Sequence, residues 1–236
     1  MKANTQYKNE ALSALKGNWA PAVLVSVIFF FVTLLCVLPS EVPLLTGAME
    51  DFTALAQSQD IEGMMDAYST MTSWSSLGTL MMIFLYSVLY LGFMNAFLKL
   101  LREGDDRLTS NMFQLSFKNY WHKVWGMFLM YLFTFLWSLL LIIPGIVKSF
   151  SYAMTPYILE ERPELSANEA IDHSCSMMKG HKFDLFWLYL SFIGWGILCI
   201  FTLGIGLLWL MPYMQTSVAA FYEDVKADYE LNGGLV

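Results

Sequence analysis

Apolar stretches of about 20 residues recur along this chain and are separated by short polar segments. The longest apolar region runs from Trp121 to Leu159 and is interrupted by Pro144-Gly145, with Lys148 just past the break. Residues 124–143 carry no charge and are long enough for a helix that crosses a hydrocarbon core of roughly 30 Å. Proline removes a backbone donor and glycine permits a positive φ. We therefore expect a tight turn at Pro144-Gly145 and a shorter returning helix.

The same pattern predicts an all-α polytopic membrane protein with six transmembrane helices, arranged as three in-out-in hairpins with amphipathic interfacial helices. We expect a single integral membrane domain over residues 1–236, which begins with an interfacial helix at residues 1–17. The membrane helices are expected at residues 18–38, 77–98, 124–143, 145–159, 183–201 and 207–222.

The segment 39–76 is acidic and contains no Lys or Arg. Its carboxylates are those of Glu41, Glu50, Asp51, Asp60, Glu62 and Asp66. Because cytoplasmic loops of membrane proteins are enriched in Lys and Arg, we expect this segment to be an outside loop, helical and close to the surface. With six crossings, all of the 13 Lys and Arg except Lys148 fall in segments assigned to the inside. Both termini are then cytoplasmic.

The composition agrees with a membrane protein and disfavours nucleic-acid binding. Hydrophobic residues make up 57% of the chain and charged residues 14%, whereas soluble proteins carry about 25% charged residues. Aromatic residues, at 16%, suit the interfacial belts of membrane helices. The net charge of −7 is divided between two membrane faces, and no basic patch is dense enough to follow a phosphate backbone.

The first apolar segment is either a membrane helix or a secretory signal peptide. We favour the membrane helix, because the apolar part of residues 18–38 exceeds the usual signal-peptide length of about 7–15 residues and no small-x-small cleavage site follows. Bulky Leu34 and Leu35 precede Cys36, which disfavours a lipoprotein site. The odd number of cysteines predicts free thiols.

Three of the expected outward-going helices follow a similar passage that contains a hydroxyl, a lysine and an aromatic residue. The passages are Ser13–Trp19, Ser116–Trp121 and Ser176–Phe183. Basic interfacial helices meet anionic headgroups, and aromatic residues lie at the membrane boundary. The pattern indicates either three copies of one in-out-in unit, related about an axis along the membrane normal, or the usual placement of Lys and Trp before a crossing.

Four passages together resemble a known family. They are Pro144–Leu159, Pro163–Ile171, Met178–Lys182 and Phe201–Gly206. In them the chain is similar to domain-of-unknown-function family 975, a group of bacterial integral membrane proteins. Its proline-glycine hairpin also resembles, more loosely, the membrane domain found beside bacterial glycerophosphodiester phosphodiesterases. The resemblance implies a bacterial plasma-membrane protein and brings no catalytic residues.

The candidate intramembrane polar site consists of Lys148, Asn95 and Gln215. An ionisable group near a membrane helix is a functional hypothesis by default, and Lys148 either binds an anion or pairs with an acid such as Glu41. It also lies only about one turn inside the expected helix, close enough to snorkel to the interface, and we favour snorkelling or a structural salt bridge.

Other candidate chemistry is weaker, and we predict no catalytic residue, no cofactor and no metal site. His173, Cys175 and His181 lack zinc-ligand spacing, and the neighbours Asp172, His173 and Ser174 point apart on a helix, where they are expected at the surface. Methionine pairs in membrane proteins mostly fill gaps, and the outer carboxylates lack the spacing of a calcium loop. The dense acids Glu160, Glu161, Glu164 and Glu169 are expected to solvate and cap a helix.

Two functions remain open, and a membrane enzyme, which would need paired carboxylates or a nucleophile–base pair at the interface, ranks third. The first is a non-enzymatic scaffold or regulator of a membrane protein partner, supported by spans with few polar residues to line an aqueous path. The alternative is a small transporter or exporter component, supported by parallel hairpins, Pro212, Asn95, Gln215 and Lys148. The lipid bilayer is the expected environment, nucleic acid is not an expected partner, and the oligomeric state stays undetermined at this level.

Overall fold

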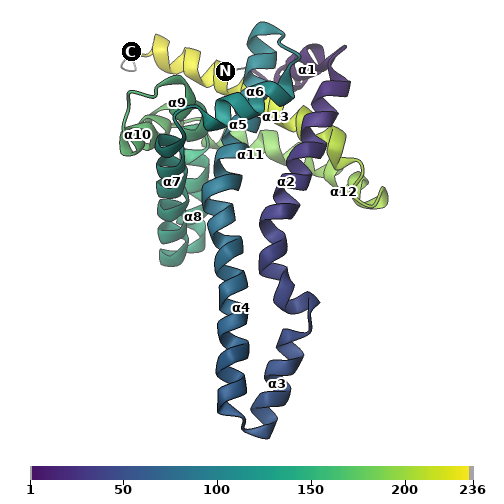
Figure 1. The fold of residues 1–236 in the computed structure, drawn as a ribbon. Coiled ribbons are helices and arrows are strands. Elements are labelled where there is room, and N and C mark those ends of the chain that lie inside the picture. The colour runs from purple at the N-terminus through teal and green to yellow at the C-terminus, as the bar shows by residue number, and fades with distance from the viewer. Residues whose placement is uncertain (1, 234–236) are drawn as a thin grey trace. The chain divides into compact units, whose positions relative to one another are not determined.

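The computed structural model describes residues 2–233, and this part of the chain is built of helices without a β-strand (Figure 1). Thirteen α-helices and one π-helical turn, η1, follow one another. Their bounds are α1 Asn4–Leu15, α2 Trp19–Leu45, α3 Ala48–Ser58, α4 Ile61–Met81, η1 Met82–Tyr86, α5 Ser87–Glu103, α6 Leu108–Phe117, α7 Tyr120–Leu140, α8 Ile142–Tyr152, α9 Thr155–Glu161, α10 Ala167–Met177, α11 Lys182–Leu190, α12 Ile193–Phe201 and α13 Leu207–Leu231.

The chain divides into two compact units. Unit 1 comprises Met1–Ile28 together with Val88–Val236, and unit 2 comprises Phe29–Ser87. Residue 1 and residues 234–236, which the predicted domain also includes, lie outside the described part of the chain.

The core of unit 1 is made by helices that are distant in the sequence. Tyr7 of α1 is fully buried and meets the edge of Phe221 of α13 at a ring-centroid distance of 5.5 Å. Tyr157 of α9 stacks on Tyr222 of α13 at 4.6 Å. Aromatic pairs of this kind add to the stabilisation that burial of their apolar area provides. Helix α13 is therefore a central element of unit 1.

Unit 2 is a helical hairpin formed by the later part of α2, α3, α4 and η1. The expected helical character of the acidic segment is confirmed, and Asp60 caps α4 by accepting a hydrogen bond from the Gly63 amide at 3.0 Å. The helix that contains the predicted first crossing, residues 18–38, does not end at Pro39, because α2 continues through Pro39 and Pro43 to Leu45. Membrane helices tolerate internal proline more readily than soluble ones.

The reversal between α7 and α8 occurs at Leu141 and not at the predicted Pro144-Gly145. Leu141 is extended, with φ −158° and ψ 140°, and α8 begins at the next residue. Pro144 lies in the first turn of α8, where the missing N–H costs no intrahelical hydrogen bond. Gly145 serves close packing, since a Cβ there would lie 2.2 Å from Ser138 Oγ.

Four helical stretches are long and apolar enough to cross a membrane: Trp19–Ser58, Ile61–Glu103, Tyr120–Leu140 and Lys182–Phe201. They correspond to the predicted crossings at 18–38, 77–98, 124–143 and 183–201. The predicted crossings at 145–159 and 207–222 are not among them. The first is divided between the short helices α8 and α9, and the second forms the start of α13, whose C-terminal half is charged.

A helix–turn–helix corner occurs three times in unit 1. In each copy a short helix, α1, α6 or α10, leads into a turn with a left-handed residue, after which an apolar helix begins. The left-handed residues are Gly17, Asn119 and Gly180, with φ of 88°, 52° and 95°. Each directly follows a lysine, and these corner lysines are Lys16, Lys118 and Lys179. The recurrence predicted from the sequence therefore has a geometric counterpart.

Candidate functional site

Lys148 lies on α8 against two aromatic rings. Its Nζ is 4.8 Å from the ring centroid of Trp137 on α7 and 5.7 Å from that of Tyr152. Such cation–π contacts stabilise an ammonium group where water is scarce. Within residues 88–233 no carboxylate forms an ion pair with Lys148. The side chain is half-buried, about 10 Å along the helix from the turn at Leu141.

Asn95 is buried on α5 and joins this helix to α9. Its amide nitrogen donates to the carbonyl oxygen of Leu91 at 3.0 Å and to that of Pro156 at 3.1 Å. Its Oδ1 atom is buried without a hydrogen-bond partner among the described residues. A buried amide that is half satisfied costs stability unless another group binds it.

Gln215 lies on α13, where its side chain is 9% exposed and its Oε1 is likewise buried without a partner in the described chain. No hydrogen bond or ion pair joins any two of Lys148, Asn95 and Gln215 in residues 2–233. Thr155 and Tyr157 on α9 also carry buried, unpartnered hydroxyls. The interior of unit 1 thus contains scattered polar atoms, and the three predicted residues are not directly bonded into one site.

A polar cluster joins α5, α9 and α13, and sequence reasoning missed it; its members are Arg102, Glu161, Tyr222, Glu223 and Lys226. Glu161 accepts hydrogen bonds from Lys226 Nζ at 2.6 Å and from Tyr222 Oη at 2.8 Å, and it also pairs with Arg102. Burial alone would raise the pKa of Glu161. The hydrogen bonds from Lys226 and Tyr222 and the charge of Arg102 outweigh burial and hold this pKa below its ordinary value.

Lys123 and Glu160 form a second buried ion pair. Lys123 lies in the first turn of α7, its side chain is only 1% exposed, and its Nζ contacts both the Glu160 carboxylate and the carbonyl oxygen of Leu115. The prediction that Glu160 and Glu161 solvate a helix end is therefore wrong. The predicted capping box is confirmed, with Glu169 N donating to Ser166 Oγ at 3.3 Å and Ser166 N donating to Glu169 Oε2 at 2.7 Å.

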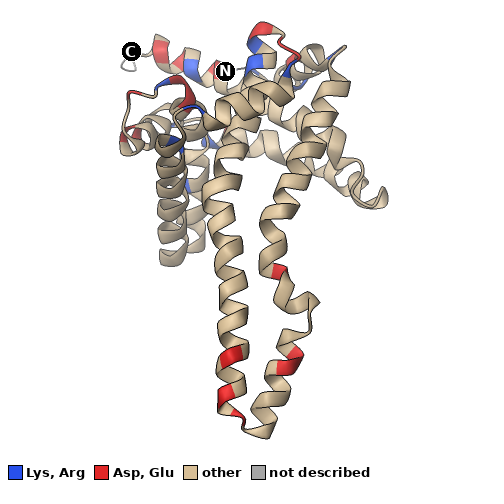
Figure 2. Ribbon diagram, in the orientation of Figure 1, with Lys and Arg blue, Asp and Glu red and all other residues tan. Residues whose placement is uncertain are grey.

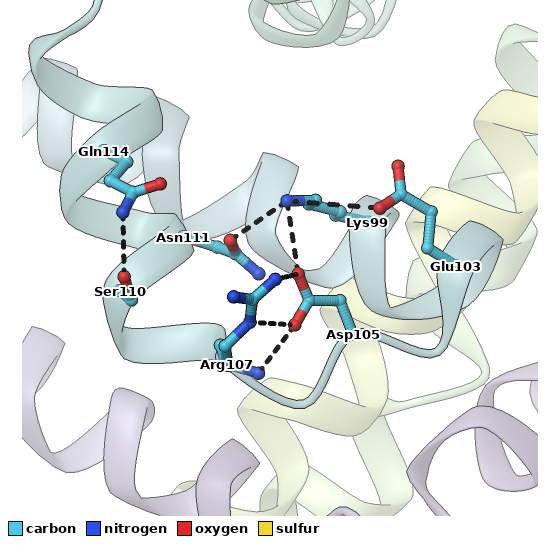
Figure 3. A network of polar contacts seen from close by, with 7 residues as sticks. All are labelled: Lys99, Glu103, Asp105, Arg107, Ser110, Asn111 and Gln114. Carbon is cyan, nitrogen blue, oxygen red and sulfur yellow. Dashed lines mark hydrogen bonds and ion pairs between the residues drawn. The ribbon is translucent and has the colours of Figure 1, made fainter.

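A third polar network closes the loop between α5 and α6 (Figure 3). Asp105 lies at its centre, where it forms a bidentate pair with Arg107 at 3.0 and 3.1 Å and an ion pair with Lys99 at 3.2 Å. Lys99 also donates to Asn111 Oδ1 at 3.2 Å. Hydrogen bonds from Arg107 hold the pKa of Asp105 well below its ordinary range. The network orders a loop and leaves Asp105 fully engaged.

His173 lies on α10 beside a small cavity of about 10 Å³, which is the size of one water molecule. Both ring nitrogens are buried without a partner in the described residues, and the ring meets Tyr229 of α13 at 5.1 Å. Burial and the nearby charges of Arg162 and Lys226 lower the pKa of this imidazole. As predicted, Asp172, His173 and Ser174 point apart, but only Asp172 is fully at the surface, whereas Ser174 is buried.

The apolar stretch Lys182–Phe201 is interrupted between α11 and α12. Lys8 of α1 reaches this break, where its Nζ donates to the Ser191 carbonyl at 3.0 Å and lies 4.3 Å from the centroid of the Phe192 ring. The break leaves carbonyl groups without intrahelical partners, and the ammonium group satisfies one of them. A cation thus stabilises the interruption of a helix that is long enough to cross a membrane.

Metal-ligand geometry is not found in the described chain, where no group of three or more His, Cys, Asp or Glu side chains converges. The cysteines Cys36, Cys175 and Cys199 are free thiols, as the sequence predicts.

These features define the class of protein. An all-helical chain with four helices long and apolar enough to cross a membrane is typical of an integral membrane protein. A family model described as "Protein of unknown function (DUF975)" matches residues 1–148 and 139–229, and the chain belongs to this family. No curated protein and no solved structure matches the chain.

Proposed function

We propose that this protein is a non-enzymatic scaffold or regulator that holds a protein partner at the bacterial plasma membrane. The observation that carries the proposal is the length of the helical hairpin. The stretch Ile61–Glu103 is helical over 43 residues, whereas a single crossing needs about 20 residues. A helix of this length extends well beyond the hydrocarbon core.

The far part of the hairpin has a surface suited to contacts with another molecule. On α4, Ile61, Met65 and Tyr68 recur at helical spacing and are 74%, 68% and 59% exposed. Glu62 and Asp66 lie beside them along the helix. Figure 2 shows that charged residues on this hairpin are all acidic. Exposed apolar side chains outside a membrane commonly mark sites of association.

The topology that fits this proposal has six crossings and cytoplasmic termini. In it, α8 and the part of α9 up to Leu159 form the fourth crossing and the first part of α13 forms the sixth, which preserves the separation of basic and acidic segments. Cysteine labelling tests the arrangement. A cysteine introduced at Asp60 is expected to react with a membrane-impermeant reagent from outside intact cells. Reaction only from the inside would reverse the scheme.

A small transporter component is the second candidate, and the broken helix favours it. Interrupted membrane helices supply free backbone groups at the substrate and ion sites of many transporters. The pair Lys8 and Ser191 has this character, and the buried amides Asn95 and Gln215 supply polar atoms within the same unit. In this case purified protein in liposomes would move a solute, and Lys8→Met would abolish the flux.

In-cell photo-crosslinking tests the scaffold proposal. A photoreactive residue at Met65, which is exposed, is expected to join one partner of defined mass, identified by mass spectrometry. The same residue at Met64, which is half-buried on the neighbouring face of α4, is the matched control. A second probe at Asp172 on α10 reports on the opposite membrane face in the proposed topology. Crosslinks only to lipid from Met65 and Asp172 would contradict a scaffold.

A further inference from the structure

The corner lysines Lys16, Lys118 and Lys179 differ from most other cations of unit 1 because their charges are unpaired. Lys99, Arg102, Lys123 and Lys226 all form ion pairs. Arg162 and Lys182 are also without an ion pair among the described residues, but neither directly precedes a left-handed residue. The corner lysines are exposed, and their ammonium groups form no ion pair or hydrogen bond with any residue between 2 and 233. Their charges are available to a ligand outside the chain.

The three corner lysines also have the same structural setting. Each follows a short helix that packs one face into unit 1, through Ala11 and Leu15 on α1, Met112 on α6, and Ala170 and Ile171 on α10. Each precedes a left-handed residue and the start of an apolar helix. In Figure 1 the three short helices lie toward the same end of unit 1. The packing holds three free ammonium groups at the starts of three apolar helices.

The neighbouring residues place these corners at the headgroup level of a bilayer. Trp19, Trp121 and Phe183 follow the corner lysines by three or four residues, and Trp121 and Phe183 are 73% and 66% exposed. Aromatic side chains at the end of a membrane helix prefer the boundary between headgroups and hydrocarbon. A lysine just outside this boundary lies at the depth of the lipid phosphate groups.

We propose that Lys16, Lys118 and Lys179 form a three-part binding surface for anionic phospholipid headgroups, with phosphatidylglycerol as a fitting ligand. Charge complementarity and continuity with the bilayer identify this occupant. A lysine at the membrane surface contributes to binding of anionic lipid by roughly fivefold in affinity. A lysine after a helix C-terminus also complements the helix dipole, but that effect requires no lipid. The proposal needs membrane insertion and is independent of the scaffold function.

The test measures which lipid the purified full-length protein retains. Detergent-solubilised protein is incubated with equal amounts of phosphatidylglycerol and phosphatidylcholine, re-isolated, and its bound lipid is quantified by mass spectrometry. The wild-type protein is expected to be enriched in phosphatidylglycerol. The triple variant Lys16→Gln/Lys118→Gln/Lys179→Gln is expected to lose this enrichment, and each single substitution is expected to lower it by up to about fivefold. Added salt should weaken it in the wild type.

Two matched variants separate specific binding from general charge. Lys2→Gln/Arg107→Gln/Arg162→Gln removes the same charge elsewhere in unit 1 and should keep the enrichment, as should the corner variant with three arginines. Thermal unfolding followed by tryptophan fluorescence verifies folding, and the single substitutions replace the triple variant if that does not fold. Equal enrichment in the wild type and the corner variants, or equal loss in the control variant, would overturn the proposal. Dependence on one lysine alone would also overturn the three-part surface.

Discussion

The two units of this chain differ in how their charged groups are bonded and in how many side-chain bonds join distant segments. Unit 1 contains all the basic residues and joins its helices by ion pairs and by side-chain bonds between distant segments, such as Arg102 with Glu161. Unit 2 has six carboxylates, no Lys or Arg, and no ion pair within Phe29–Ser87. Its hydroxyl groups bond to their own helix, as Thr72 does with the carbonyl oxygen of Tyr68 at 2.9 Å. Unit 1 is therefore held by long-range contacts, and unit 2 mainly by local helical bonds.

The largest effect is expected from breaking the buried pair in unit 1. Lys123→Ala leaves Glu160 charged and poorly solvated, and should lower the free energy of unfolding by about 3–5 kcal/mol. Chemical unfolding in detergent, followed by tryptophan fluorescence, measures it. The double variant Lys123→Met/Glu160→Met should recover most of the loss, because an apolar pair of similar volume leaves no unpaired charge. A double variant less stable than Lys123→Ala would show that the loss in Lys123→Ala does not come from an unpaired charge on Glu160.

The next largest loss of stability is expected when the close packing of α7 on α8 is disturbed. Gly145→Ala places a Cβ 2.2 Å from Ser138 Oγ and 2.7 Å from Ser138 Cα, so α7 and α8 must move apart. We expect a loss of about 1–3 kcal/mol in the free energy of unfolding, measured by the same assay. Gly194→Ala is the control, since no heavy atom lies within 4 Å of its added Cβ. Equal effects at the two positions would show that the packing of α7 on α8 is not tight.

Removal of a hydroxyl that bridges distant segments should also lower the stability of unit 1. Ser174 Oγ donates to the Ser151 carbonyl at 2.8 Å and accepts from the Met154 amide at 3.2 Å. Ser174→Ala leaves both backbone groups buried without this partner, at an expected cost of about 1–3 kcal/mol in the free energy of unfolding. Hydrogen exchange at the Met154 amide gives a local measurement. Unchanged protection there would mean that another group replaces the hydroxyl.

The pH dependence of unit 1 should reflect His173. Its folded pKa is lowered by burial and by Arg162 and Lys226, so the unfolded chain binds a proton more readily. Stability is then fully present above the unfolded pKa of about 6.5 and falls as the pH drops below it, by at most about 1.4 kcal/mol per pH unit. The groups around the ring include Glu161 and Glu230 as well as the two cations.

Thermal unfolding between pH 7.5 and 5.5 measures this slope. His173→Phe keeps a ring against Tyr229 and should flatten the dependence. A slope that survives the substitution would show that His173 is not its source.

The smallest effect is expected in unit 2. Thr72→Ala removes a hydroxyl that bonds to backbone atoms of its own helix, and it should change the free energy of unfolding by less than about 0.5 kcal/mol. The comparison with Ser174→Ala, which removes the same group from unit 1, is the direct test of the difference between the units. A loss in Thr72→Ala as large as that in Ser174→Ala would remove this distinction.

Features that depend on neighbours in the sequence could be predicted from it. The capping box at Ser166 and Glu169 is such a feature, because its two bonds join residues three apart. The helical acidic segment is another, since apolar residues at helical spacing indicate it. Pro144-Gly145 was an incomplete signal. It indicated a helical hairpin correctly. A proline is equally acceptable in the first turn of the returning helix, so the reversal lies at Leu141, three residues before the proline.

Pairings between distant residues could not be predicted in the same way. Glu160 and Glu161 look like solvent-exposed charges near a helix end, yet their partners Lys123 and Lys226 lie 37 and 65 positions away. The spacing of charges along the chain does not indicate which residues pair across such long sequence separations. Lys148 is similar, because its ring partner Trp137 is brought near only by the reversal between α7 and α8.

By itself the sequence determined the apolar helices, the acidic hairpin and the three recurring corners, because helix formation and partition into lipid depend on local composition and periodicity. Only the tertiary structure decided which cations are neutralised and which remain free. That choice depends on how helices from α1 to α13 pack, since an ion pair forms only where packing brings two charges within a few ångströms. Lys16, Lys118 and Lys179 are among the cations that this packing leaves without an ion pair in the described residues.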